Sequence, residues 1–358
     1  MINIIGNILG TSGYDIHTRQ LANALNKYVD VRLVTQVPPG AEGQLSDKEL
    51  EMVKRKDFDI NLIITNPIYW RNYLTAKRNW VFLVWEGNKI PKSFINECLN
   101  LDIEYIFVPS THTKKAVENT VCDLFWDKFT KEELMNKIKV IPHGVNLDLF
   151  FSKEKPKDKF RFLCNKGFRN MEDRGGIQYA VQAYLEEFSK NDDIEMIVKI
   201  NPAYPIGDLN KLIKQVAPKR NDLPHLQINA QALPYDKMVH LYNSAHVFVS
   251  PTRADAFNLP VAESMACELM PLTTNFGGQV DYVNTDNGML IDYELTEIKH
   301  EVTYEGIRWA TPNISDLRKK MRWCYENQEE VTIKAKKALK DIKNWTWDET
   351  SKKINQLI

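Results

Sequence analysis

The sequence lacks several features by which secreted, disulfide-rich and membrane-spanning proteins are recognised. Its 358 residues include only five cysteines, scattered and never spaced as CxxC, so neither a disulfide framework nor a cysteine zinc site is indicated. It contains no run of about 18 apolar residues that could cross a bilayer. The apolar first segment, residues 1–9, lacks the layout of a signal peptide and is interpreted as a buried strand. We therefore expect a cytoplasmic protein.

An excess of charge of either sign is also missing, because 47 basic side chains face 47 acidic ones. Proteins that bind nucleic acid neutralise phosphates with Lys and Arg, so no nucleic-acid partner is expected for a balanced chain. Two late basic stretches, Arg318–Arg322 and Lys334–Lys343, carry apolar residues at helical spacing and are interpreted as solvated helix faces. Peripheral membrane contact stays open as an alternative, but nothing in the sequence supports it.

The nucleotide and metal motifs with the best-defined chemistry are absent as well. The loop Gly6–Gly13 follows an expected strand, but its glycines are not spaced as GxGxxG, and Gln36 stands where NAD enzymes need a carboxylate. The chain has no GxxxxGK[ST] loop and no HExxH pair. Asp57-Phe58-Asp59 has the DxD form that can hold a metal-bound nucleotide, but it precedes a strand, whereas ligands bind where strands end. No metal or other cofactor is expected.

The chain does contain a repeated alternation of short apolar strands and helical stretches. This alternation predicts parallel strands with helices on both faces of each sheet. The expected fold class is α/β, with two doubly wound Rossmann-like domains facing a central cleft. The strands are predicted at residues 2–5, 31–35, 60–65, 80–84, 105–108 and 139–141, and then at 160–163, 195–200, 226–229, 247–250 and 270–273.

The boundary between the two domains is predicted near residue 152. The segment 151–158 is polar and contains Pro156, which is typical of a linker. We therefore assign residues 1–152 to an acceptor-side domain and residues 153–344 to a donor domain. The terminal helix, residues 345–358, is expected to pack back on the first domain.

The most informative stretch runs from Ser250 to Cys267. A buried strand ends in a polar loop, and a helix then begins near Pro260, a residue that suits the first helical turn. Amides near Phe257–Val261, together with the positive end of the helix, are expected to suit a diphosphate. Two carboxylates, Asp255 and Glu263, flank this turn.

This stretch resembles the signature of the family-four (group 1) retaining glycosyltransferases. The signature has two carboxylates separated by seven residues around a Gly-Phe-Gly-Leu-Pro-like core, and here Asp255 and Glu263 enclose Phe257–Pro260. Two positions depart from the pattern: Asp255 replaces a glutamate and Asn258 replaces a glycine. Because aspartate is one methylene shorter, the preference for a donor sugar stays open. Weaker similarities follow the family's order along the chain, at residues 10–25, 108–110, 141–146, 275–278 and 345–348.

The resemblance implies the GT-B fold and gives roles to several residues. Glu263 would hold the ribose of the nucleotide and Asp255 a hydroxyl of the transferred sugar. Arg174 corresponds to the lysine of a Lys-Gly pair that meets the donor phosphates. Arg169 is the first candidate for a second cation at that site, and Lys166 is its rival.

Further donor-binding residues are expected on two loops, Gly10 and Gly13 on the first and Phe257, Asn258 and Leu259 on the second. A separate candidate, Glu86, follows an expected strand of the first domain and could orient an acceptor hydroxyl. The resemblance gives no support for Glu86 at the level of a motif.

The predicted function is that of a retaining, metal-independent glycosyltransferase. It would move a sugar from a UDP- or GDP-linked donor to a carbohydrate, lipid or protein-linked acceptor. The alternative is a catalytically inactive protein of the same fold that binds nucleotide sugars or serves as a scaffold. The departures at Asp255 and Asn258 keep this alternative open.

Overall fold

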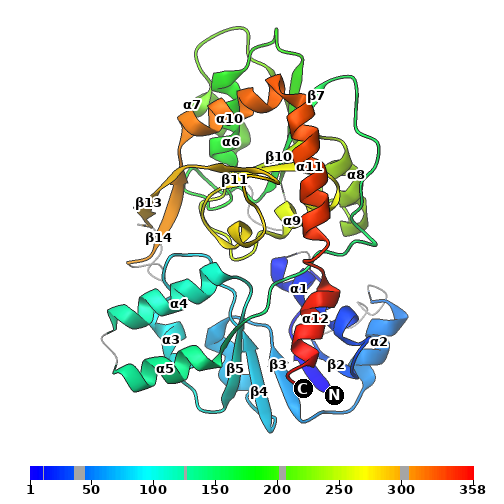
Figure 1. Cartoon of the computed structure of the whole chain (residues 1–358), viewed down its shortest axis with the longest axis vertical. Helices are drawn as coiled ribbons and strands as arrows, with labels where there is room; N and C mark the ends of the chain where they lie inside the picture. The colour runs from blue at the N-terminus through cyan, green and yellow to red at the C-terminus, as the bar shows by residue number, and fades with distance from the viewer. Residues whose placement is uncertain (11, 36–44, 125–126, 201–206, 299–305) are drawn as a thin grey trace. The chain divides into compact units, whose positions relative to one another are not determined.

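The computed structural model of the chain describes residues 1–10, 12–35, 45–124, 127–200, 207–298 and 306–358 (Figure 1). It divides into two compact units. Unit 1 comprises Met1–Gly144, Ile298–Ile307 and Trp345–Ile358, and unit 2 comprises Val145–Glu297 and Arg308–Asn344. Within the described ranges, no helix is both long and apolar enough to cross a membrane. Gln36, weighed above against an NAD site, lies outside the described residues.

Unit 1 is built on a six-stranded parallel sheet with the order β2-β1-β3-β4-β5-β6. Its central strands are buried on both faces, which requires helices on each side. The strands are β1 (Ile2–Ile5), β2 (Val31–Val34), β3 (Ile60–Ile63), β4 (Arg78–Phe82), β5 (Ile103–Val108) and β6 (Ile138–Val140). The helices are α1 (Gly13–Leu25), α2 (Asp47–Lys54), α3 (Lys92–Cys98), α4 (Thr111–Asp123), α5 (Lys128–Lys137) and α12 (Trp347–Asn355), with a 3₁₀ turn η2 at Pro67–Tyr73.

The last helix of the chain, α12, lies beside the first helix, α1, within unit 1 (Figure 1). Its first residue, Trp347, is buried against two histidine rings, with centroids 5.5 Å from that of His17 and 5.7 Å from that of His143. Burying a large aromatic ring contributes on the order of 2–3 kcal/mol. This packing holds the terminal helix on unit 1, against residues that lie far from it in the sequence.

Unit 2 is built on a second six-stranded parallel sheet, in the order β12-β11-β10-β7-β8-β9. Its strands are β7 (Phe160–Lys166), β8 (Ile194–Ile200), β9 (His225–Asn229), β10 (Val247–Ser250), β11 (Met270–Thr274) and β12 (Met289–Ile291). Its helices are α6 (Ile177–Glu187), α7 (Leu209–Val216), α8 (Met238–Asn243), α9 (Leu259–Ala266), α10 (Ile314–Glu326) and α11 (Gln328–Ile342), with 3₁₀ turns η3 (Tyr235–Lys237) and η4 (Gly278–Asp281). The two parallel sheets confirm the predicted α/β class.

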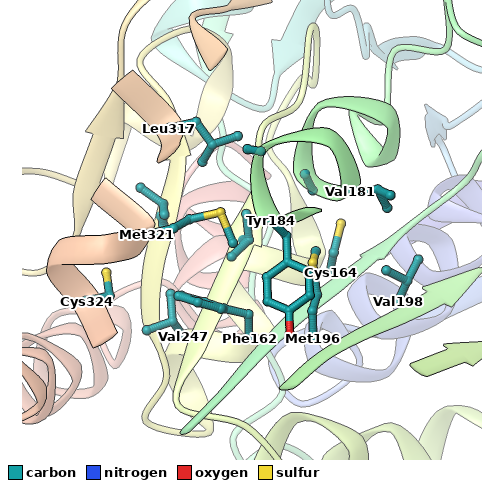
Figure 2. Close-up of a cluster of buried hydrophobic side chains, with 14 of the residues drawn as sticks. Phe162, Cys164, Val181, Tyr184, Met196, Val198, Val247, Leu317, Met321 and Cys324 are labelled. Carbon is teal, nitrogen blue, oxygen red and sulfur yellow. The ribbon is translucent and has the colours of Figure 1, made fainter. Parts of the chain in front are cut away.

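The core of unit 2 forms where α6 and α10 pack on one face of this sheet (Figure 2). Alternate residues of β7, Phe162 and Cys164, point into it and meet Tyr184 of α6 and Met321 of α10. The basic residues of α10 lie outside this core. Arg322 of that helix forms ion pairs with Glu187 and Asp192. One residue of the basic stretch 318–322 therefore has acidic partners within unit 2.

The units divide at Gly144/Val145, eight residues before the expected boundary at 152/153. The reason is that residues after Gly144 already contact unit 2. The ring of Phe150 packs on Tyr235 and Tyr242, at 5.2 and 5.7 Å between centroids, and Lys153 donates its amide to the side chain of Asn243.

A second difference is an antiparallel hairpin of β13 (Tyr293–Glu297) and β14 (Arg308–Pro312), which the sequence analysis did not predict.

Candidate active site

The candidate site of unit 2 lies where the strand order of its sheet reverses, between the neighbouring strands β7 and β10. The chain runs from β7 outward to β8 and β9 on one side, and from β10 outward to β11 and β12 on the other. Loops that leave the carboxyl ends of two such strands diverge and make room for a ligand. Lys166 ends β7 and Ser250 ends β10, so the segment 250–263 starts at this point.

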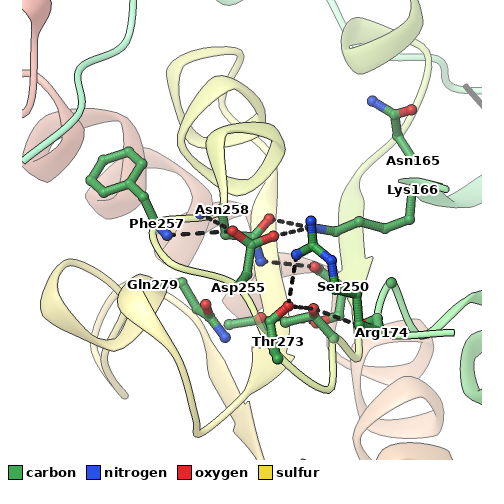
Figure 3. A network of polar contacts seen from close by, with 12 residues as sticks. Asn165, Lys166, Arg174, Ser250, Asp255, Phe257, Asn258, Thr273 and Gln279 are labelled. Atoms are coloured by element: carbon green, nitrogen blue, oxygen red, sulfur yellow. Dashed lines mark hydrogen bonds and ion pairs between the residues drawn. The ribbon is translucent and has the colours of Figure 1, made fainter. Parts of the chain in front are cut away.

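Lys166 makes the central contact of the site. Its ammonium lies 3.0 Å from Oδ2 of Asp255 and 2.5 Å from Oδ1 of Asn258 (Figure 3). The Lys166 side chain is only 7% exposed and that of Asp255 22%, so the pair is largely shielded from water. A shielded pair is screened less than a surface pair and fixes the positions of both charges. Lys166, the rival candidate, is therefore the cation that the fold places beside Asp255.

Asp255 also organises the turn that follows it. Its Oδ1 accepts hydrogen bonds from the amides of Phe257 (3.3 Å) and Asn258 (2.7 Å), while its Oδ2 receives Lys166. The amide of Val261 is bonded to the carbonyl of Asn258. Our expectation that amides near Phe257–Val261 would be open to a diphosphate is therefore wrong for these three, because the carboxylate of Asp255 and the first helical turn already engage them.

Arg174 lies on the loop before α6, its side chain points toward Asp255 in Figure 3, and its positive charge lowers the pKa of that carboxyl group. Its Nη1 donates to the carbonyl of Ala254, and its own carbonyl accepts from the amide of Arg253 at 2.8 Å. Gly176 makes this close approach possible, since it has φ of +86° and a Cβ there would collide with the carbonyl of Pro251.

These two cations determine the ionisation of Asp255. Burial by itself would raise its pKa, but the charges of Lys166 and Arg174 and the hydrogen bonds from Lys166 and Asn258 outweigh burial, so the pKa lies below its ordinary value of 3.8. Asp255 is thus a carboxylate at neutral pH, able to accept a hydrogen bond from a hydroxyl group but not to donate a proton.

Glu263 lies in α9 in a different environment. It is buried, and its two oxygens accept hydrogen bonds from the hydroxyls of Tyr235 (2.7 Å) and Tyr242 (2.6 Å). Burial raises the pKa of Glu263 to about 7, against the opposing effect of the two tyrosine hydrogen bonds and the more distant charge of Lys166. Sequence reasoning missed both tyrosines, because they precede Glu263 by 28 and 21 residues and no spacing connects them to it.

Asn258 replaces the glycine of the family pattern and keeps the backbone conformation of the turn. Its backbone is left-handed, with φ of 71°, a conformation that glycine adopts freely and asparagine tolerates better than most residues. Its side chain adds contacts that glycine lacks, since Oδ1 accepts from Lys166 and Nδ2 donates to Ser250 at 3.1 Å. Tyr282 braces the turn by donating to the carbonyls of Phe257 and Asn258.

Other residues expected at the donor site lie elsewhere in unit 2 or face its interior. The Arg169 side chain is 56% exposed and lies 4.0 Å from Asp173. No contact joins it to Asp255 in the described part of unit 2. Phe257 is buried against the ring of Tyr282, at 5.0 Å between centroids, and Leu259 begins α9. Of these three, only Phe257 contacts Asp255, through its backbone.

The glycine loop belongs to unit 1. Gly10 donates its amide to Asp15, and its carbonyl accepts from Arg19 at 3.0 Å, while Gly13 is exposed in the first turn of α1. Ser12 caps the same helix, and its reciprocal bonds with Asp15 fix the turn. The loop is therefore held by side chains of its own helix.

Glu86 follows β4 in unit 1, at the carboxyl edge of the first sheet. Its carbonyl is bonded to Nε2 of His112 at 2.9 Å, and the adjacent Trp85 donates its indole N–H to the carbonyl of Lys89. These bonds hold the loop in a defined shape, with the Glu86 side chain partly exposed.

The DxD sequence lies at the amino end of β3. Asp57 is paired with Arg32 and Asp59 with Lys77, and both carboxylates are more than two-thirds exposed. Among the described residues, no group of three or more His, Cys, Asp and Glu side chains is placed to hold a metal ion.

Comparisons with known proteins identify relatives in sequence and in fold. Residues 206–341 match the family described as glycosyl transferases group 1. A probable sucrose-phosphate synthase of Thermosipho melanesiensis is 25% identical over 231 residues, which is 63% of this chain and 48% of that protein, so the chain spans about half the length of this relative.

Among solved structures, a glycosyltransferase from Rickettsia africae has 16% identity and a TM-score of 0.70 over 99% of this chain and 97% of its own. Anabaena HepE, crystallised with UDP-glucose, has 13% identity and a TM-score of 0.64 over 99% and 98%. These likenesses concern the fold, and the family match covers the segment that contains Asp255 and Glu263. The chain therefore has the GT-B fold, and its segment 206–341 matches the group 1 glycosyl transferases.

Proposed function

We propose that this protein transfers a sugar from a UDP- or GDP-linked donor to a hydroxyl group of a carbohydrate, lipid or protein-linked acceptor, with retention of the anomeric configuration and without a metal ion. The observation that carries the proposal is the convergence of Lys166 and Arg174 on Asp255, at the sheet position where α/β proteins bind ligands. HepE, which shares the fold, was crystallised with UDP-glucose, in agreement with a donor of this class.

In this proposal the two cations receive the diphosphate of the donor. Breaking the bond between the sugar and the phosphate leaves additional negative charge on the diphosphate, which preorganised positive groups stabilise. A guanidinium can bind two phosphate oxygens in parallel, so Arg174 is a suitable replacement for the lysine of the family pattern. Lys166 is already held in place by Asp255 and Asn258, so little side-chain freedom is lost on binding.

The two carboxylates take different parts of the donor. Asp255, which stays ionised, accepts a hydrogen bond from a hydroxyl of the transferred sugar. Glu263 accepts from the ribose, and Tyr235 and Tyr242 hold its carboxyl group in one orientation for that contact. As the bond from the anomeric carbon to the phosphate oxygen breaks, the acceptor oxygen bonds to that carbon from the same face and passes its proton to the leaving phosphate.

The acceptor is assigned to unit 1. Glu86 lies on a loop at the carboxyl edge of its sheet and would orient the attacking hydroxyl. Tyr69, in the turn that follows β3, is 52% exposed, and aromatic rings of this kind pack well on sugar faces.

Transfer with a panel of labelled nucleotide sugars tests the proposal. The wild type should consume a UDP- or GDP-sugar in the presence of EDTA, and proton NMR of the first product should show the anomer of the donor. Asp255→Asn should lower turnover far more than it weakens binding of the nucleoside diphosphate. Tight nucleotide binding without transfer to any acceptor would favour the inactive binding protein, and an inverted product would refute retention.

A further inference from the structure

Three polar side chains stand in one row across the carboxyl ends of β7, β8 and β9. Asn165 is in register with Lys199, and Lys199 with Asn229. Residues in register on neighbouring parallel strands point to the same face of a sheet, so the three share a face. The neighbouring residue Lys166 points the other way, toward Asp255, as Figure 3 shows for Asn165 and Lys166.

This row continues directly into the surroundings of Glu263. Asn165 donates its Nδ2 to the hydroxyl of Tyr242 at 3.3 Å, and Tyr242 donates to Glu263 at 2.6 Å. Two groups of polar residues are therefore neighbours at this end of the sheet. The first group, Asp255, Lys166 and Glu263, has the proposed sugar, phosphate and ribose contacts. The second group, Asn165, Lys199 and Asn229, has no assigned role.

Lys199 is the most unusual member of the row. It is only 3% exposed, and its ammonium donates to the carbonyl of Ile200 at 2.5 Å. In the described part of the chain, no carboxylate oxygen lies within 4.0 Å of this ammonium, whereas Lys166 has Asp255. Burial lowers the pKa of Lys199. Buried cations are normally paired with a carboxylate, so a lysine at the ligand-binding edge of a sheet to which the described residues offer none indicates a group supplied from outside.

The hydrogen-bonding capacity of the row defines the chemistry of that group. An ammonium can only donate. Asn229 uses its side-chain oxygen on the amide of Gln231, at 3.1 Å, which leaves its NH₂ group as a donor. Asn165 donates its NH₂ group to Tyr242 and retains its oxygen as an acceptor. The row thus offers donors at Lys199 and Asn229 and an acceptor at Asn165.

We propose that Asn165, Lys199 and Asn229 recognise the base of the donor nucleotide and select a base with a carbonyl oxygen next to a ring N–H. Uracil and guanine both have this edge. Adenine presents an amino group and an unprotonated ring nitrogen in the corresponding places, which would leave the buried ammonium facing another donor. Sites that bury a polar group discriminate strongly against a ligand that cannot pair with it. This inference rests on the proposed function, because Glu263 as the ribose contact places the base next to the row.

Calorimetric titration with UDP, GDP, ADP and inorganic pyrophosphate at fixed salt tests the inference. The wild type should bind UDP or GDP at least about tenfold more tightly than ADP, and Lys199→Met should weaken the preferred nucleotide about 10- to 100-fold, the scale of one charged hydrogen bond. The variant should bind ADP and pyrophosphate as the wild type does. Lys211→Met, which removes an exposed lysine of α7, is the matched control and should change nothing.

Each other outcome would overturn a defined part of the inference. An equal loss for all four ligands would place Lys199 on the phosphates, and no loss, or a preference for ADP, would remove the row from base recognition. If Lys199→Met does not fold, Asn229→Ala should still reduce the preference for UDP or GDP over ADP, and an unchanged preference there would refute the row. Failure of the wild type to bind any nucleotide would instead refute the proposed function.

Discussion

The environment of Glu263 predicts a specific dependence of stability on pH. Burial raises the pKa of this carboxyl group from 4.5 to about 7 in the folded protein, so the folded state holds a proton that the unfolded state has already lost. The stabilisation is therefore complete below pH 4.5 and is lost as the pH rises through 7. A difference of about 2.5 pKa units corresponds to roughly 3 kcal/mol, at about 1.4 kcal/mol per unit.

The variant Glu263→Gln removes the titration and keeps the shape of the side chain. The free energy of unfolding of the variant should not contain the decrease that the ionisation of Glu263 causes in the wild type. Between about pH 4.5 and pH 8 the wild type should therefore lose roughly 3 kcal/mol of stability relative to the variant. Urea unfolding of both proteins at half-unit steps of pH gives this difference directly. A constant offset is expected as well, because glutamine offers one acceptor to two tyrosine hydroxyls, but the offset does not depend on pH.

A surface variant controls for the general effect of removing a carboxylate. Glu132→Gln changes a side chain of α5 that is 62% exposed, and its curve should run parallel to that of the wild type. Parallel curves for Glu263→Gln and the wild type would refute the reasoning, since they would mean that Glu263 ionises alike in the folded and unfolded states.

Three further predictions follow from the site. Asn258→Ala should be less stable than Asn258→Gly by about 1 kcal/mol in thermal denaturation, because alanine keeps a Cβ in the left-handed conformation; equal stability would contradict the strain. Arg174→Ala should lower turnover about 10²- to 10³-fold, whereas Arg169→Ala, which removes an exposed side chain, should change it no more than about twofold; the reverse ranking would reassign the phosphate contacts. Transfer should survive excess EDTA, and Asp57→Ala should be near neutral, because Asp57 is paired with Arg32 at the amino end of a strand; rescue by Mn²⁺ after EDTA would contradict this.

Much of the fold could be predicted from the sequence, because the strands of both sheets are short apolar runs with clear ends. The strands expected at 2–5 and 247–250 have those bounds in the structure. The hairpin of β13 and β14 was missed, because ten residues of sequence separate the two strands and a hairpin is recognised by a short turn.

The site was harder to predict, because its members come together through strand ends and helix faces. The apolar run of β7 predicted an end at Leu163, but the strand continues for three more residues and carries Lys166 to the edge of the sheet. The resemblance to the family instead favoured Arg169, which lies beyond the end of this strand. Tyr235 and Tyr242 reach Glu263 only through the packing of η3 and α8 next to α9, which no local pattern encodes.

The central claim is that Lys166, beside Asp255 at the β7/β10 position, binds the diphosphate of the donor. The most direct test is a calorimetric titration of UDP and GDP into the wild type, Lys166→Met and the control Lys157→Met, whose lysine is 83% exposed in the same unit. We predict that Lys166→Met weakens the preferred nucleotide about 10- to 100-fold, the scale of one charged hydrogen bond to phosphate, and that Lys157→Met binds as the wild type does. Unchanged affinity in a folded Lys166→Met protein would contradict the account, because the donor phosphates would then lie elsewhere.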